Sequence, residues 1–322
     1  MAPATWTSRT PIPRAVREQH WFWHGSPLLR QDKGSDMKPA HFDYHRASTV
    51  EHAVNLLVEL GDEARVLAGG QSLIPMMNFR LARPAHLIDI TGIEDLKTIR
   101  RGDQGQLHLG ALVTHHQVER LADSELDPGH RLLRNAMSRV GHLPIRTLGT
   151  VGGSLAHGDS TGEWAALAIL YSATIVVHGP SGRRTIAAED FTFGTYATAL
   201  EPDEVLTEII FPAAGPNGVT TEFARRRGDF ALVAAAIIPP HPDHEISGRV
   251  MLSGPTPTPI RIQEAERVLK DGTNPAPDLA DLVADIAASS IDYPDDGPVT
   301  GSYGRSLVHS IVKHCCEEAV TP

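Results

Sequence analysis

The sequence predicts an α+β protein in which two units, each with a glycine-rich loop, precede a smaller C-terminal domain. Three observations lead to this fold class. Helical and strand patterns follow one another without strict β–α–β alternation. Two Gly-Gly pairs, Gly69-Gly70 and Gly152-Gly153, each stand ahead of a helical pattern. A stretch rich in glycine, alanine and proline at 213–218 reads as a linker to the rest of the chain.

In the front part of the chain, short apolar runs and helical spacing take turns. Thr49 is a candidate N-cap, and Gly61 is placed to end the helix that follows it. Thr114 is expected to cap another helix, and Gly141 to stop a third. The expected strands are 41–44, 65–68, 86–90 and 107–113, and the expected helices are 49–57, 73–79, 114–121 and 130–140.

Further along, a glycine-rich segment at 146–157 is expected to lead into a helix at about 163–170. The turn residues 179–182 favour a hairpin between 174–178 and 184–186. A strand at 205–211 should end before Pro212. Behind the linker we expect strands near 220–226 and 249–253 and helices at 261–269, 278–288 and about 305–319.

The composition excludes several classes of protein. With 29 basic and 39 acidic residues the formal net charge is −10, which argues against nucleic acid as the main partner, because phosphate binding needs a basic face. Two adjacent cysteines, Cys315 and Cys316, are too few for a disulfide framework or an iron–sulfur cluster, and we expect reduced thiols in a helix. No run approaches 18 apolar residues and no secretion signal is evident. We therefore expect a cytoplasmic protein without a membrane span.

Residues 1–36 differ in composition from the rest. They hold three of the four tryptophans, Trp6, Trp21 and Trp23, and five basic against three acidic residues, which leaves −12 on the remainder. Either this segment is an arm whose tryptophans dock on a partner, or it is upstream sequence included by the choice of start site. We favour the second interpretation, because Met37 opens the folded pattern abruptly. Residues 1–36 are then not part of the fold.

The first glycine segment has the chemistry of a phosphate site. Paired glycines allow positive φ and can present successive N–H groups to an anion, and Ser72 adds a hydroxyl at the start of a helix. Neither a P-loop nor a G-x-G-x-x-G fingerprint is present. The second segment, 150–154, repeats this chemistry about 80 residues later. Two such loops could clamp a pyrophosphate from both sides, although spacing alone leaves two purely structural turns as an equal alternative.

Several blocks in consistent order resemble the FAD-binding medium subunit of molybdenum hydroxylases, the xanthine dehydrogenase and carbon monoxide dehydrogenase family. The resemblance runs from about Met37 to the C-terminus and leaves residues 1–36 without a counterpart. The matching blocks are Ala68-Gly69-Gly70-Gln71-Ser72-Leu73-Ile74-Pro75, Arg80-Leu81-Ala82-Arg83-Pro84, Leu87-Ile88-Asp89-Ile90, Gly149-Thr150-Val151-Gly152-Gly153-Ser154-Leu155-Ala156-His157, Thr198-Ala199-Leu200-Glu201-Pro202, Arg226-Arg227-Gly228-Asp229-Phe230-Ala231 and Gly301-Ser302-Tyr303.

The resemblance implies a vanillyl-alcohol-oxidase-type FAD-binding fold, with subdomains at 37–92 and 93–213 and a C-terminal domain at 218–322. It also implies contacts of Glu163 with the adenosine half of FAD, of Leu206 with the cofactor and of Phe230 with the isoalloxazine. Ser154 stands where many members have asparagine. The residues implied for the pyrophosphate are Leu67, Ala68, Gly69, Gly70, Gln71, Ser72, Leu73 and Ile74, together with Thr150, Val151, Gly152, Gly153 and Ser154, and Thr147 is implied as a further cofactor-binding residue.

Other conspicuous side chains carry less weight. His115 and His116 are adjacent on an expected helix start and should point apart, so we expect no metal site there. Trp164 is expected in a helix core rather than stacked on a cofactor. His157 follows the second segment, but FAD is expected to be non-covalent. The run Arg225-Arg226-Arg227 is either a solvated strand end or a counter-charge for the cofactor.

The leading functional hypothesis is a FAD-carrying electron-transfer subunit of a heteromeric molybdenum hydroxylase. The resemblance then places the molybdenum cofactor on a large partner subunit and 2Fe-2S clusters on a small one, with NAD or oxygen as the electron acceptor. The cofactor carries the redox chemistry, and no side chain need be an acid–base catalyst. The alternatives are a self-contained flavin oxidase or reductase with its own substrate, and a non-enzymatic nucleotide-binding assembly subunit.

Overall fold

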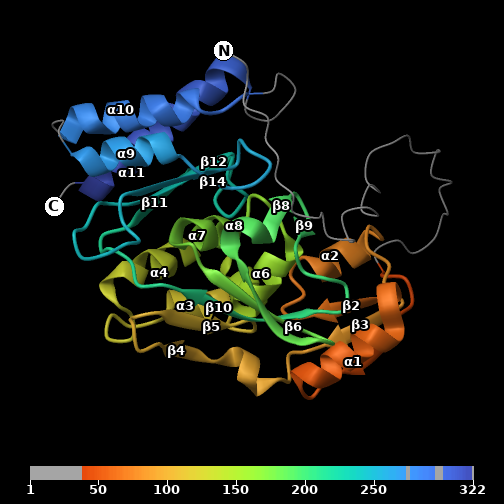
Figure 1. Cartoon of the computed structure of the whole chain (residues 1–322). Helices are drawn as coiled ribbons and strands as arrows, with labels where there is room; N and C mark the ends of the chain where they lie inside the picture. Colours follow the sequence, from red (N-terminus) through yellow and green to blue (C-terminus); the bar gives the residue numbers. More distant parts are fainter. Residues whose placement is uncertain (1–37, 273–275, 294–299, 321–322) are drawn as a thin grey trace, which may run out of the picture. The chain divides into compact units, whose positions relative to one another are not determined.

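A computed structural model describes residues 38–272, 276–293 and 300–320, and Figure 1 shows how their elements are arranged. The expectations for residues 1–36 lie outside these ranges. Three sheets organise the described chain, and a short fourth ladder joins β8 (Thr192–Gly194) to β9 (Ala197–Thr198). No helix in the described ranges combines the length and apolarity needed to cross a bilayer. The mixture of helical and strand layers confirms the expected α+β class.

The first sheet is parallel, in the order β1 (Asp43–Arg46), β3 (His86–Asp89), β2 (Ala64–Leu67). Helix α1 (Val50–Leu60) begins at Thr49, whose side chain accepts a hydrogen bond from the His52 N–H. Its buried face packs with Ile88 in a small core. The sequence patterns for this unit are confirmed, because strand–helix–strand units with clear caps are specified locally. The short helix α2 (Leu73–Asn78) follows the first glycine segment.

The second sheet is antiparallel and has the order β4-β5-β10-β6-β7. Helix α7 is apolar on all sides, and the aromatic rings of Trp164 and Tyr171 pack against Phe211 in the largest core. The strands are β4 (Ile99–Arg101), β5 (Leu107–Gly110), β6 (Thr174–Gly179), β7 (Gly182–Ala187) and β10 (Val205–Phe211), and the helices are α3 (His115–Glu119), α4 (Arg131–Met137), α5 (Leu143–Leu148), α6 (Val151–His157), α7 (Glu163–Tyr171) and α8 (Ala188–Phe191).

The third sheet lies between two helical layers (Figure 1). Helices α9–α11 cover one face, and α4 and α7 contact the other. Cys315 and Cys316 are free and buried on α11, and burial raises the pKa of their thiols to about 12 and about 11. The strands are β11 (Val219–Phe223), β12 (Val233–Ile238), β13 (Arg249–Ser253) and β14 (Ile260–Arg261), and the helices are α9 (Gln263–Asp271), α10 (Ala276–Ser289) and α11 (Gly301–Val320).

Three features of the fold were not expected. The second glycine segment is not a loop but the first turns of α6. The segment just before it, read only as glycine-rich, forms α5. The apolar run at 231–238 contains strand β12, whose alternate side chains enter two different cores: Ala236 and Ile238 face the main core, and Ala235 and Ile237 the C-terminal one. A strand buried on both faces shows no alternation in sequence, which is why its pattern was missed.

Candidate functional site

The first glycine segment forms an open row of backbone donors between β2 and α2. Gly70 has φ +69°, a conformation that glycine adopts without strain. Within the described residues, nothing accepts a hydrogen bond from the N–H groups of Gly69, Gly70, Gln71 or Ser72. The Gln71 amide instead donates to the Gly69 carbonyl at 3.0 Å. Four adjacent N–H groups without a partner are suited to bind an anion such as a phosphate.

Gly69 also lies directly against α5. A Cβ atom at position 69 would collide with the Leu148 carbonyl and lie 2.9 Å from the Gly149 Cα. Because both atoms belong to the backbone, no side-chain rotation could relieve this contact. The absence of a side chain at position 69 is therefore required by packing, independently of any ligand.

The second glycine segment uses its backbone donors within the protein. The Val151 N–H donates to the Val113 carbonyl and the Gly152 N–H to the Ala111 carbonyl, both at 2.9 Å. The Gly153 N–H donates to Thr150 Oγ1, which caps α6, at 3.0 Å. The expectation that this segment repeats the backbone chemistry of the first was wrong. Its free polar group is the Ser154 hydroxyl, which has no hydrogen-bond partner among the described residues.

The structure nevertheless brings the two segments together. A Cβ atom at Gly153 would lie 3.7 Å from the Cβ of Ala68, and a Cβ at Gly152 would lie 2.5 Å from that of Ala111. Glycine at 152 thus lets α6 approach the end of β5, and at Gly153 the same helix lies beside Ala68 of the first segment. Thr147, which was also predicted to bind the cofactor, lies on exposed α5. Its hydroxyl donates a hydrogen bond to the Pro144 carbonyl at 3.0 Å.

A buried histidine behind the site was not assigned a role from the sequence. His115 is 5% exposed, and its Nδ1 accepts a hydrogen bond from Trp164 Nε1 at 2.9 Å. Its Nε2 would lie 2.8 Å from a Cβ at Gly149. Burial lowers the pKa of His115 to about 4, and the Arg146 charge acts in the same direction. His116 points away and pairs with Glu119, so the two rings diverge as expected, and Trp164 lies in the core.

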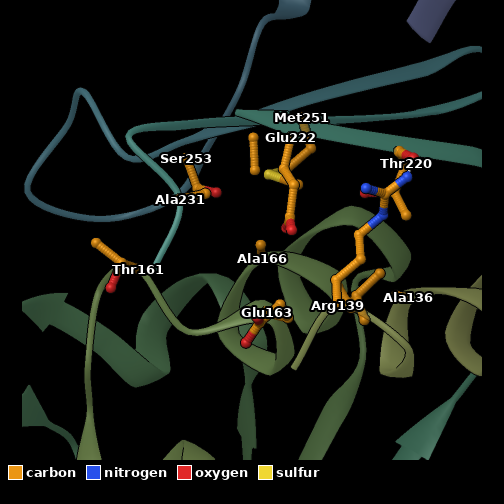
Figure 2. A pocket seen from close by; sticks show the side chains of 12 residues that line it. Ala136, Arg139, Thr161, Glu163, Ala166, Thr220, Glu222, Ala231, Met251 and Ser253 are labelled. Carbon is orange, nitrogen blue, oxygen red and sulfur yellow. Dashed lines mark hydrogen bonds between the residues drawn. The ribbon is translucent and has the colours of Figure 1, made fainter. Parts of the chain in front are cut away.

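Glu163 lies at the start of α7, beside a small cavity that faces the third sheet (Figure 2). The cavity holds about 20 Å³, and Glu222 of β11 and Arg139 after α4 also line it. Burial raises the pKa of the Glu163 carboxyl to about 7; its own N–H opposes this, and the charges of Glu222 and Asp159 add to it. The preceding residue, Gly162, faces Ser154: a Cβ there would lie 3.6 Å from the Ser154 Oγ.

The remaining two predicted contacts lie in different surroundings. Leu206 is 4% exposed and packs in the main core, on β10. Phe230 is 58% exposed in the loop between β11 and β12. The His157 ring lies against the Tyr196 ring in a tilted arrangement with centroids 4.9 Å apart, and burial lowers the pKa of His157. The structure therefore gathers the glycine segments, Ser154 and the Glu163 region, and it leaves Leu206 inside the core.

This arrangement fits a dinucleotide. The unpaired N–H groups of 69–72 suit the anionic oxygens of a pyrophosphate, and the start of α6 lies beside them, with Gly153 next to Ala68. The fold and this pair of segments define a flavin-binding protein of two α+β units and a C-terminal domain. Two family models agree: the FAD binding domain in molybdopterin dehydrogenase matches residues 40–214, and the CO dehydrogenase flavoprotein C-terminal domain matches residues 220–319.

The chain belongs to the FAD-binding medium subunits of the molybdenum hydroxylase family. The 6-hydroxypseudooxynicotine dehydrogenase complex subunit alpha of Paenarthrobacter nicotinovorans is 33% identical over 88% of this chain and 96% of its own length. The carbon monoxide dehydrogenase medium chain of Afipia carboxidovorans is 34% identical over 88% and 98%.

Solved structures show the same fold. Carbon monoxide dehydrogenase from Hydrogenophaga pseudoflava matches with a TM-score of 0.79 and 33% identity, over 88% of this chain and 98% of the other. Quinoline 2-oxidoreductase from Pseudomonas putida 86 matches with a TM-score of 0.77 and 29% identity, over 88% and 97%. The chain is thus an oxidoreductase subunit with a FAD-binding domain, as the sequence resemblance implied.

Proposed function

We propose that the chain holds FAD non-covalently and passes electrons from iron–sulfur clusters on a small partner subunit to an acceptor such as NAD or oxygen. The molybdenum cofactor would lie on a large partner subunit; two relatives of this chain are named a nicotine 6-hydroxylase medium subunit and a carbon monoxide dehydrogenase medium chain, which supports a complex of several subunits. The single observation that carries the proposal is the row of unpaired N–H groups at 69–72, held against the second glycine segment.

Within this proposal each part of the site has a distinct task. Gly69, Gly70, Gln71 and Ser72 donate backbone hydrogen bonds to the pyrophosphate, along the segment from Leu67 to Ile74. Because the backbone of α6 is already engaged, Thr150 and Ser154 contribute through their hydroxyl groups. Gly152 contributes by letting α6 pack closely on Ala111, and Gly153 by its position beside Ala68. Bound FAD supplies the redox chemistry; the protein binds and orients it.

The other assignments follow the same division. Thr147 offers a hydroxyl on α5, Glu163 an acidic group toward the adenosine half, and Phe230 an exposed ring toward the isoalloxazine. Leu206 supports the cofactor from within the core rather than at its surface. We retain the domain bounds 37–92, 93–213 and 218–322. In support, one matched family segment ends at residue 214 and the next begins at residue 220. The cytoplasmic location also remains part of the proposal.

The decisive experiment is to purify the chain and record its visible spectrum before and after incubation with FAD. We expect the two flavin absorption bands to remain with the protein after gel filtration. Denaturation with acid should release the flavin into the supernatant, because the attachment is non-covalent. A chain that retains no flavin under either condition would contradict the proposal.

A further inference from the structure

On the face of the third sheet that meets α7, a small side chain lies between two polar ones. The strand register places Glu222 of β11 opposite Ala234 of β12, and Ala234 opposite Ser253 of β13. Residues paired in this way share one face of a sheet. The backbones at Glu222 and Ser253 are two strand spacings of about 4.8 Å apart. The methyl group of Ala234 fills little of the space between their side chains.

These three residues line the cavity of Figure 2. The facing wall is α7, where Ala166 is again a small residue. The cavity gives about 20 Å³ to the centre of a water molecule, and a single water needs at least about 10–15 Å³ of such space. The site therefore has room for one water molecule, and it is far too small for a nucleotide or an organic substrate.

The Ser253 hydroxyl has hydrogen-bonding capacity that the described residues leave unused. Ser253 is 4% exposed, and its Oγ has no hydrogen-bond partner in the described part of the chain. Among the same residues, Thr221 Oγ1 is the one fully enclosed side-chain polar atom without a partner. The Ser253 Oγ therefore has open space beside it, and the space that Ser253 lines is this cavity. A buried hydroxyl is more stable with a partner than without one.

Glu222 brings a hydrogen-bond acceptor to the same space. Figure 2 shows its side chain pointing from the sheet toward Ala166 of α7. Its carboxyl has no hydrogen-bond or ion-pair partner among the described residues. Burial raises the pKa of Glu222, and the Arg139 charge opposes this shift without an ion pair, because the Arg139 guanidinium is bound to the Thr220 carbonyl at 2.9 Å. The Glu222 carboxyl thus faces the cavity with its lone pairs free.

We propose that the cavity between Glu222 and Ser253 is a binding site for one structural water molecule. The water donates one hydrogen bond to the Glu222 carboxyl and shares a second with the Ser253 hydroxyl. Two polar partners in a space of this size meet the usual requirements of a buried water. A metal ion is less suited, because the described residues contain no group of three or more histidine, cysteine or acidic side chains able to hold one.

The position gives this water a structural task. The cavity separates the start of α7 from the inner face of the third sheet, and Glu163 lines it from the helix side. Where a side chain could have filled the gap, a hydrogen-bonded water joins the front units to the C-terminal sheet. The site depends neither on bound FAD nor on a partner subunit, so its test is independent of the proposed function.

Two measurements on the full chain test the site. A crystal structure locates the water, and oxygen-17 relaxation dispersion of the solvent counts long-lived internal waters. The test variant, Ala234→Val, places two further methyl groups in the cavity, and valine is well suited to a strand. The matched control, Ala187→Val, makes the same change at an exposed position of β7.

We expect a water within hydrogen-bonding distance of Glu222 and Ser253 in the wild type and in Ala187→Val. Ala234→Val should lack it, and its dispersion amplitude should fall by the contribution of one water. A wild type without this water, a bound cation in its place, or an Ala234→Val that retains it would overturn the inference. If Ala234→Val does not fold, Ser253→Ala decides: the water should exchange about tenfold faster with one partner lost, and unchanged exchange would overturn the inference.

Discussion

Gly69 shows how much one missing side chain does in this protein. Position 69 sits against the backbone of Leu148 and Gly149, where even a methyl group has no room. The same residue supplies the first of four unpaired N–H groups. Packing and ligand chemistry therefore require glycine for independent reasons.

We predict that Gly69→Ala displaces α5 from the first glycine segment. Overpacking of this kind costs about 1–3 kcal/mol of the free energy of unfolding, and the dissociation constant for FAD should rise at least about tenfold, which corresponds to about 1.4 kcal/mol. Urea denaturation and flavin titration measure the two effects. Gly194→Ala, where a Cβ would meet only ordinary contact at 3.6 Å, is the control. Equal FAD affinity in both variants would contradict the packing argument.

His115 makes a second prediction at this scale. Its pKa is lowered from 6.5 to about 4 by burial, so the neutral ring stabilises the fold fully above pH 6.5, and this contribution is lost as the pH falls through about 4. His115→Gln lacks the titrating ring. We expect it to be less stable at pH 7 but to lose less free energy of unfolding between pH 6.5 and 4. Denaturation midpoints of the wild type and His115→Gln between pH 6.5 and 4 test this prediction. If the two curves of stability against pH were parallel, His115 would not carry the acid sensitivity.

At the scale of elements, α6 is the part that sequence reasoning misread. Its two glycines suggested a loop, but the helix begins there because the N–H groups of Val151 and Gly152 donate to the carbonyls of Val113 and Ala111, about 40 residues earlier. Such long-range partners leave no local pattern. Helix α1 could be predicted because its N-cap and its apolar face are both specified by residues close together in the sequence.

The cap of α6 can be tested directly. Thr150 is 5% exposed and accepts the Gly153 N–H. Thr150→Ala should cost about 1 kcal/mol of the free energy of unfolding, within the usual range for a lost N-cap. It should also weaken FAD binding, because this hydroxyl is one of the three that we assign to the cofactor. Thr150→Ser keeps the oxygen and should restore most of both properties. A serine variant as weak as alanine would assign the effect to the lost methyl group instead.

At the scale of the whole described chain, the front units meet the C-terminal sheet around a pair of carboxyls. Glu163 comes from α7 and Glu222 from β11, and burial raises the pKa of both (Figure 2). The Arg139 charge, which opposes the shift at Glu222, has its guanidinium bound to the Thr220 carbonyl at 2.9 Å. Raising the pH should therefore weaken this junction.

The pKa of Glu163 gives the direction in which the free energy of unfolding changes with pH. Its pKa rises from 4.5 to about 7 on folding, so its protonated form favours the fold at low pH, and this contribution is lost as the pH rises through about 7. Relative to the wild type, Glu163→Gln should therefore gain free energy of unfolding as the pH rises from 4.5 to 7. Urea denaturation of both proteins at matched pH measures the difference, with Glu264→Gln on exposed α9 as control. A difference between Glu163→Gln and the wild type that stays constant with pH would contradict the shift.

The family and the cofactor segments could be predicted from sequence because their motifs are contiguous and ordered. Ala68–Ser72 lies where its pattern placed it, between a strand and a helix. Three features could not be predicted, because each depends on residues from separate elements. They are the packing of His115 against Gly149, the cavity beside Glu163 and the burial of Leu206. The contacts proposed for Glu163, Leu206 and Phe230 remain predictions until FAD is bound.

Helix α5 has a further consequence, which concerns distance. It has six residues, and at 1.5 Å per residue it is about 9 Å long. One end abuts the first glycine segment, and the other abuts the loop of residues 224–232 between β11 and β12, where Gly228 faces His142. Helix α5 is therefore a spacer of fixed length between the first glycine segment and the loop that carries Phe230. If the segment holds the pyrophosphate and Phe230 meets the isoalloxazine, as we propose, lengthening α5 by one turn should weaken FAD binding, because the two contacts would no longer match the length of the cofactor.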